Sequence, residues 1–158
     1  MSSFDRRAIL LSLAALAGCG LTPVYGRGAS ALALRGGVEV STPDSREAFR
    51  LKARIEDRLG PPQSAPYRLD VTLALTEVPV GVSTGQDITR YTLRGKADYV
   101  LTEVATGTII DHGQVENFTG YSATGTSVAT LAADRDARDR LSVILADQII
   151  ARLLIALA

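Results

Sequence analysis

The chain of 158 residues contains no tryptophan, one cysteine and one histidine. One cysteine cannot form an internal disulfide, so packing alone must hold the fold. With one histidine and one cysteine, most structural metal sites and most catalytic triads are excluded. Aromatic residues are also few, at 5% of the chain, which argues against an aromatic ligand cage. We therefore expect neither a metal nor a cofactor.

The single cysteine, Cys19, follows a segment with the layout of a secretory signal peptide. Arg6 and Arg7 precede an apolar run at residues 8–17, which is shorter than the roughly 20 residues of a membrane span. Residues 16–19 (Leu-Ala-Gly-Cys) resemble the lipobox of bacterial lipoproteins, in which the cysteine is lipidated and becomes the first residue. The resemblance implies that Cys19 is a lipid anchor. The alternative is an ordinary secretory signal with a stray cysteine.

Arg6 and Arg7, with the residues around them, match a twin-arginine export signal only in part. The sequence therefore does not separate the twin-arginine route from the general secretory route. Both routes deliver the protein outside the cytoplasm. We divide the chain into a signal peptide at residues 1–18, a lipid anchor and linker at 19–30, and a single α/β domain at 31–158.

The charges of the chain are balanced, with 17 basic and 17 acidic residues. Removing residues 1–18 leaves 140 residues with 15 basic and 16 acidic side chains. A chain of that length can build one domain with a real core. Its near-neutral charge argues against a broad nucleic-acid binder.

A first strand is expected around residues 38–40, followed by a short amphipathic helix. Asp44 is placed to cap this helix, with Glu47 three residues later to close a capping box. Gly60 ends the helix, and the prolines after it prevent its return. One face of the helix carries apolar residues at helical spacing: Ala48, Leu51, Ile55 and Leu59.

The middle of the chain has the two-residue alternation of strands with one buried face. We expect one strand from Tyr67, a second at residues 88–103 and a third from Ile109 to about Phe118, with a bulge near residues 111–113. Short connections make these strands an antiparallel meander. From about Ser127 a long helix runs to the chain end, with Leu145, Ile149, Leu153 and Leu157 on its apolar face.

These elements predict an α/β (α+β) two-layer sandwich: a mostly antiparallel four-stranded sheet with two helices packed on one face. No enzyme is visible. Asp111 and His112 are neighbours on a strand, so their side chains point to opposite faces and cannot easily act together on one substrate. Gly95-Lys96 lacks the remainder of a phosphate-binding loop.

Residues 19–25 (Cys-Gly-Leu-Thr-Pro-Val-Tyr) resemble the opening Cys-Gly-Phe-x-Pro-Leu-Tyr of the outer-membrane lipopolysaccharide-assembly lipoproteins, the LptE family. Residues 129–137 resemble that family's second helix. The resemblance implies a protein anchored in the outer membrane on its periplasmic side. It would plug the barrel of a translocon partner, LptD, help that barrel to fold, and bind lipopolysaccharide. The alternatives are an accessory lipoprotein of a periplasmic lipid transporter and, more distantly, a periplasmic hydrolase.

A ligand that carries lipid phosphates would need cations on a surface outside the core. Arg90, Arg94 and Lys96 have the same parity on the second long strand, so they are expected on one face, opposite Leu93 and Ala97. We expect these three residues to contact lipopolysaccharide. The alternative is that they merely solubilise a wet sheet face.

Overall fold

The computed structural model describes residues 34–82, 85 and 88–157. Cys19 and the predicted signal peptide lie outside the described residues. The elements follow one another as β1 (Val38–Ser41), α3 (Arg46–Leu59), β2 (Tyr67–Val82), β3 (Ile88–Glu103), β4 (Ile109–Ser122) and α4 (Ser127–Ala156).

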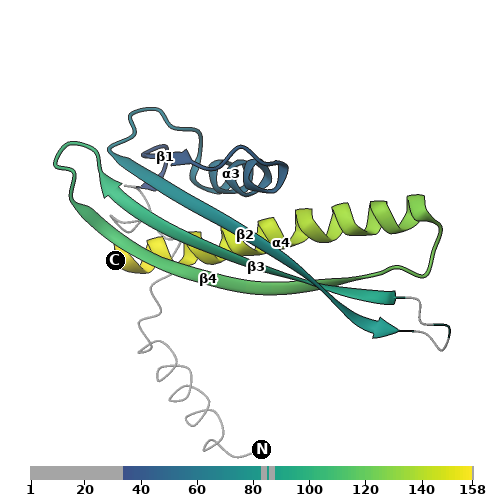
Figure 1. The fold of residues 1–158 in the computed structure, drawn as a ribbon. Helices are drawn as coiled ribbons and strands as arrows, with labels where there is room; N and C mark the ends of the chain where they lie inside the picture. The colour runs from purple at the N-terminus through teal and green to yellow at the C-terminus, as the bar shows by residue number, and fades with distance from the viewer. Residues whose placement is uncertain (1–33, 83–84, 86–87, 158) are drawn as a thin grey trace, which may run out of the picture.

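The four strands form one sheet in the order β1-β2-β3-β4. The three long strands pair antiparallel, with Leu69 opposite Leu101 and Ala97 opposite Val115. The short strand β1 pairs parallel to β2, because α3 carries the chain back between them. Figure 1 shows the long strands as a twisted meander with α4 lying along their length. The predicted α+β fold with a mostly antiparallel sheet is confirmed, with one parallel pair.

The core lies between the sheet and the helices. Alternate residues of β3 enter it, among them Leu93, Ala97 and Leu101, none of which has any exposed surface. The helix α4 contributes Leu141, Leu145, Ile149 and Leu153, which are likewise fully buried. The two-residue period of the strand and the helical period of α4 therefore bury their apolar faces against each other.

Gly95 sets how closely α4 approaches the sheet. A Cβ built at this position would lie 2.9 Å from Leu141 Cδ2 and 2.9 Å from Leu145 Cδ1. Those distances are below normal carbon–carbon contact. The absence of a side chain at Gly95 thus makes room for two leucines of α4.

Ion pairs connect the two helices. Arg46 lies 3.1 Å from Asp139, and Arg54 contacts Asp147 through two hydrogen bonds of 3.0 and 3.1 Å. The second pair is bidentate and half-buried, which favours it over a simple surface pair. These contacts align α3 with α4, while the apolar core supplies most of the packing.

Three local details differ from the sequence prediction. Ser45, not Asp44, caps α3, and its hydroxyl accepts a hydrogen bond from the Ala48 amide at 3.2 Å. The irregularity in β4 falls at Ile110, since Asp111 pairs with Leu101 and Ile109 with Thr102. β4 also continues to Ser122, four residues beyond the predicted end. The predicted helix stop at Gly60 is confirmed, with φ of 87°.

None of the helices in the described part of the chain is both long enough and apolar enough to span a membrane.

Replacing Ile149 by Asp tests the packing of α4. Ile149 is fully buried, so Ile149→Asp would place an unpaired charge in the core and should lower stability by several kcal/mol, about 3 or more. The measurement is a thermal or urea melt of the purified domain. Val128→Asp is the matched control, because Val128 on the same helix is 76% exposed and its change should have little effect. A melt of Ile149→Asp that matched the control would contradict the packing described here.

Candidate functional site

The three cations singled out in the sequence lie on the face of the sheet opposite α4. Arg90, Arg94 and Lys96 are exposed, whereas Leu93 and Ala97, of the opposite parity, are fully buried. The predicted orientation of these side chains is therefore confirmed. Their binding role stays a prediction.

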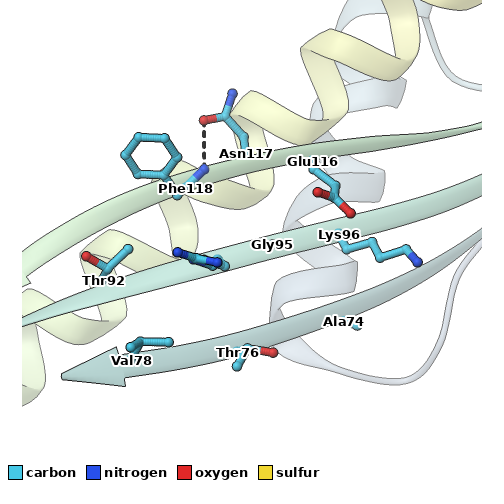
Figure 2. Close-up of a pocket in the computed structure, with 10 residues that line it drawn as sticks. Ala74, Thr76, Val78, Thr92, Gly95, Lys96, Glu116, Asn117 and Phe118 are labelled. Carbon is cyan, nitrogen blue, oxygen red and sulfur yellow. Dashed lines mark hydrogen bonds between the residues drawn. The ribbon is translucent and has the colours of Figure 1, made fainter. Parts of the chain in front are cut away.

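Arg94 and Lys96 line one groove on this outer face, with a volume of about 860 Å³. The groove crosses all three long strands, because Arg94 pairs with Thr76 on β2 and with Phe118 on β4. Figure 2 shows Lys96 on the middle strand, with Thr76 and Ala74 on one neighbouring strand and Glu116 on the other. We call this groove, lined also by Val78 and Thr92, the outer groove.

Arg90 lies in a smaller hollow of about 350 Å³ beside the outer groove. Thr92 and Phe118 line both spaces, so the two adjoin. The three cations thus share one face, but only Arg94 and Lys96 share one groove.

The outer groove combines charge with apolar surface. Phe118 is 69% exposed and is the cross-strand partner of Arg94. Figure 2 shows the Phe118 ring on its strand beside Asn117. Asn117 Oδ1 accepts a hydrogen bond from the Phe118 amide at 2.8 Å. A large exposed aromatic beside cations suits a ligand that is part apolar and part anionic.

The cations of this face are available to a ligand. Among the described residues, Arg90, Arg94 and Lys96 form no ion pair within 4.0 Å and no side-chain hydrogen bond. Glu116 is the cross-strand neighbour of Lys96, and it is the one carboxylate that lines the outer groove. An anion would therefore meet an excess of positive charge near Arg94.

A polar network on the opposite, helix-covered face ties the far end of the sheet to α4. Glu77 accepts hydrogen bonds from the Tyr121 hydroxyl at 2.8 Å and from Arg138 at 2.9 Å. Arg138 also contacts Asp134 at 2.7 Å, and the Tyr121 ring stacks on Tyr91 with centroids 5.2 Å apart. Burial, and then the bond to Glu77, raises the pKa of Tyr121, so its hydroxyl stays a donor.

Asp111 and His112 do not form an acid–base pair. Asp111 accepts a hydrogen bond from the Tyr99 hydroxyl at 3.0 Å, whereas His112 is exposed on the other face. Burial raises the pKa of Tyr99 to about 12, and the bond to Asp111 contributes. In the described ranges no group of three or more His, Cys, Asp or Glu side chains is placed to hold a metal ion.

Sequence reasoning identified the cations of the outer face but missed their neighbours. Phe118 and Thr76 lie beside Arg94 because of the pairing register of β2, β3 and β4, which the sequence alone does not give. The parity of residues 116 and 118 on β4 was the available signal, since both point away from the core. The Glu77–Arg138 contact joins residues 61 positions apart, and nothing local in the sequence marks it.

Solved structures share this fold. A lipoprotein from Caulobacter crescentus, 22% identical, superposes with a TM-score of 0.66 over 84% of this chain and 98% of its own. Rare lipoprotein B from Shewanella oneidensis, 12% identical, superposes with a TM-score of 0.56 over 73% of this chain and 92% of its own. A minor lipoprotein from Acinetobacter baumannii, 14% identical, superposes with a TM-score of 0.58 over 74% of this chain and 89% of its own.

A comparison with curated proteins gave no match. The model of the lipopolysaccharide-assembly family, LptE, matches residues 36–153. That match covers the sheet and nearly all of both helices. The resemblance noted in the sequence is therefore confirmed, and the chain belongs to the LptE family of lipopolysaccharide-assembly proteins.

Proposed function

We propose that this protein is an outer-membrane lipoprotein, anchored on the periplasmic side through Cys19, that assists lipopolysaccharide assembly by plugging an LptD-like barrel and helping it to fold. Family membership supports a role in lipopolysaccharide assembly. The signal-like N-terminus and the lipobox support the anchor, and the structural neighbours are themselves lipoproteins. The role is one of binding and assembly, without catalysis.

We further propose that the outer groove contacts lipopolysaccharide. The observation that carries this proposal is the pairing of Arg94 and Lys96, which have no ion partner among the described residues, with the exposed ring of Phe118. Lipid A carries both phosphates and acyl chains. Arg binds phosphate through a planar fork and Lys binds it as a point charge, while Phe118 and Val78 offer apolar surface.

The second candidate is an accessory lipoprotein of a periplasmic lipid transporter. The same groove favours it equally, since any phospholipid presents phosphate and acyl chains. The identity of the protein partner decides between the two functions.

A pull-down under mild detergent separates these functions. The acylated full-length chain should return a large outer-membrane β-barrel protein, because a plug needs a lumen to fill. Recovery of an inner-membrane transport component without a barrel would contradict the plug and support the transporter accessory. Ile149→Asp serves as the destabilised control and should return less of either partner, because Ile149 is buried in the core.

A triple change to Gln tests the cations of the outer face. Replacing Arg90, Arg94 and Lys96 should weaken lipopolysaccharide binding by the purified domain about tenfold or more, equivalent to about 1.4 kcal/mol. The melting temperature and the recovery of the barrel should not change, since these side chains are exposed and outside the core.

The matched control removes three exposed charges elsewhere: Arg50 on α3, and Arg135 and Arg140 on α4. This control should bind lipopolysaccharide as the parent does. Binding is measured at low salt, where screening of surface charge is weakest. Equal binding by the triple variant and the control would refute the outer groove as the contact site.

A further inference from the structure

Strand β4 forms one margin of the sheet (Figure 1). It has 14 residues, and among the described elements it pairs only with β3. The strand at the other margin, β1, has four residues. A strand at a margin presents backbone N–H and C=O groups that its own sheet does not satisfy. β4 is therefore the long open margin of this sheet.

The pairing register shows which residues of β4 direct their backbone groups outward. The Ala123 amide donates to the Thr89 carbonyl at 2.9 Å, and Tyr121 lies opposite Tyr91 in the same register. In an antiparallel pair every second residue bonds to the neighbouring strand, so the odd-numbered residues of β4 bond to β3. The even-numbered residues point their N–H and C=O away from it. We call three of them the β4 edge: His112, Gln114 and Glu116.

Phe118 supports this assignment and limits the open stretch. Phe118 is also even-numbered, and its amide donates to Asn117 Oδ1 at 2.8 Å instead of to β3. Within residues 34–82, 85 and 88–157, no hydrogen bond reaches the outward backbone groups of the β4 edge. Each of its three residues offers one donor and one acceptor, so a pairing strand can form up to about six hydrogen bonds.

β4 lacks the residues that commonly keep such a margin from pairing. Lysine and proline are the usual guards, and residues 109–122 contain neither of them. The irregularity at Ile110 lies outside the β4 edge. A row of alternating donors and acceptors without guards is complementary to another extended backbone, which would add to the sheet as a further strand.

The side chains of β4 favour one kind of extended chain over another. β4 contains two carboxylates, Asp111 and Glu116, and no Lys or Arg. Glu116 is exposed and forms no ion pair within 4.0 Å in the described part of the chain. Two copies paired margin to margin would bring carboxylates together, which is unfavourable. A strand of another protein, with Lys or Arg opposite Glu116, fits the β4 edge better.

The β4 edge adjoins the outer groove without blocking it. Glu116 and Phe118 line the groove, and Gln114 donates to Asp98 at 2.6 Å on the same face. A strand added to β4 lies in the plane of the sheet, about 4.8 Å beyond β4, whereas a ligand in the groove lies on the face. The groove and the β4 edge can therefore be occupied at the same time.

We propose that the β4 edge pairs with an extended segment of the barrel partner that projects into the lumen, and that this pairing fixes the plug in place. The inference rests on the proposed function. Strands of the barrel wall are not the occupant, because a closed barrel leaves its strands no free margin. The segment carries Lys or Arg opposite Glu116.

Amide hydrogen exchange tests this pairing residue by residue. The complex recovered by the pull-down and the free acylated chain are placed in D₂O, quenched and read by mass spectrometry with residue-resolved fragmentation. In the free chain the amides of the β4 edge should exchange fast, and in the complex they should exchange at least about tenfold more slowly. The amides of Gly113 and Val115, which bond to β3, are the internal control and should be slow in both samples.

Two substitutions at Gln114 separate its backbone from its side chain. Gln114→Pro removes an outward amide and Gln114→Ala keeps it, while both lose the hydrogen bond to Asp98. Proline is tolerated on a margin strand where the amide faces solvent, so both variants should melt near the parent. Gln114→Pro should recover about fivefold less barrel than Gln114→Ala, because the added strand loses a hydrogen bond. If Gln114→Pro did not fold, the exchange measurement would decide alone.

The outcomes separate this pairing from the proposed function. Recovery of the barrel with unchanged exchange at the β4 edge would overturn the pairing and leave the plug intact. Protection that grew with protein concentration in the absence of the barrel would show that a second copy covers the β4 edge instead. Protection in the free chain at every concentration would show that another segment of this chain covers it. A pull-down that returned no barrel would refute the proposed function, and with it the partner named here.

Discussion

The packing of α4 on one face of the three-stranded meander is the constraint on which the rest of the structure depends. The fully buried leucines Leu141 and Leu145 occupy the space that Gly95 leaves open. Once α4 covers that face, every second residue of β3 is committed to the core and the others face outward. Arg94 and Lys96 are on the outer face for this reason.

The residues that stabilise the fold therefore lie on one face of the sheet, and the proposed binding groove lies on the other. The outer groove consists of side chains from three strands whose backbones are held by cross-strand pairing. Changing those side chains costs little stability, because they are not part of the core. The Glu77–Arg138 contact strengthens the arrangement at the far end by joining β2 to α4.

The sequence predicted features governed by local periodicity. Strand alternation predicted the outward direction of Arg94, and Gly60 with the prolines after it predicted the helix stop. The structure gives Gly60 a positive φ, which suits glycine. Features that depend on tertiary register were not predictable in this way. Phe118 meets Arg94 only once the β3–β4 pairing is known. The predicted cap was Asp44, one residue before the actual cap, Ser45. Asp and Ser cap helices about equally well, so the sequence alone could not distinguish the two positions.

The central claim is that the sheet face opposite α4 is the one that meets lipopolysaccharide. Photocrosslinking tests it most directly, with a photoreactive amino acid at Thr76 in the outer groove or at Ile144, which is 36% exposed on α4. Both variants are incubated with lipopolysaccharide and irradiated. The structure predicts a lipopolysaccharide adduct from position 76 and none from position 144. An adduct from position 144 alone would contradict the claim.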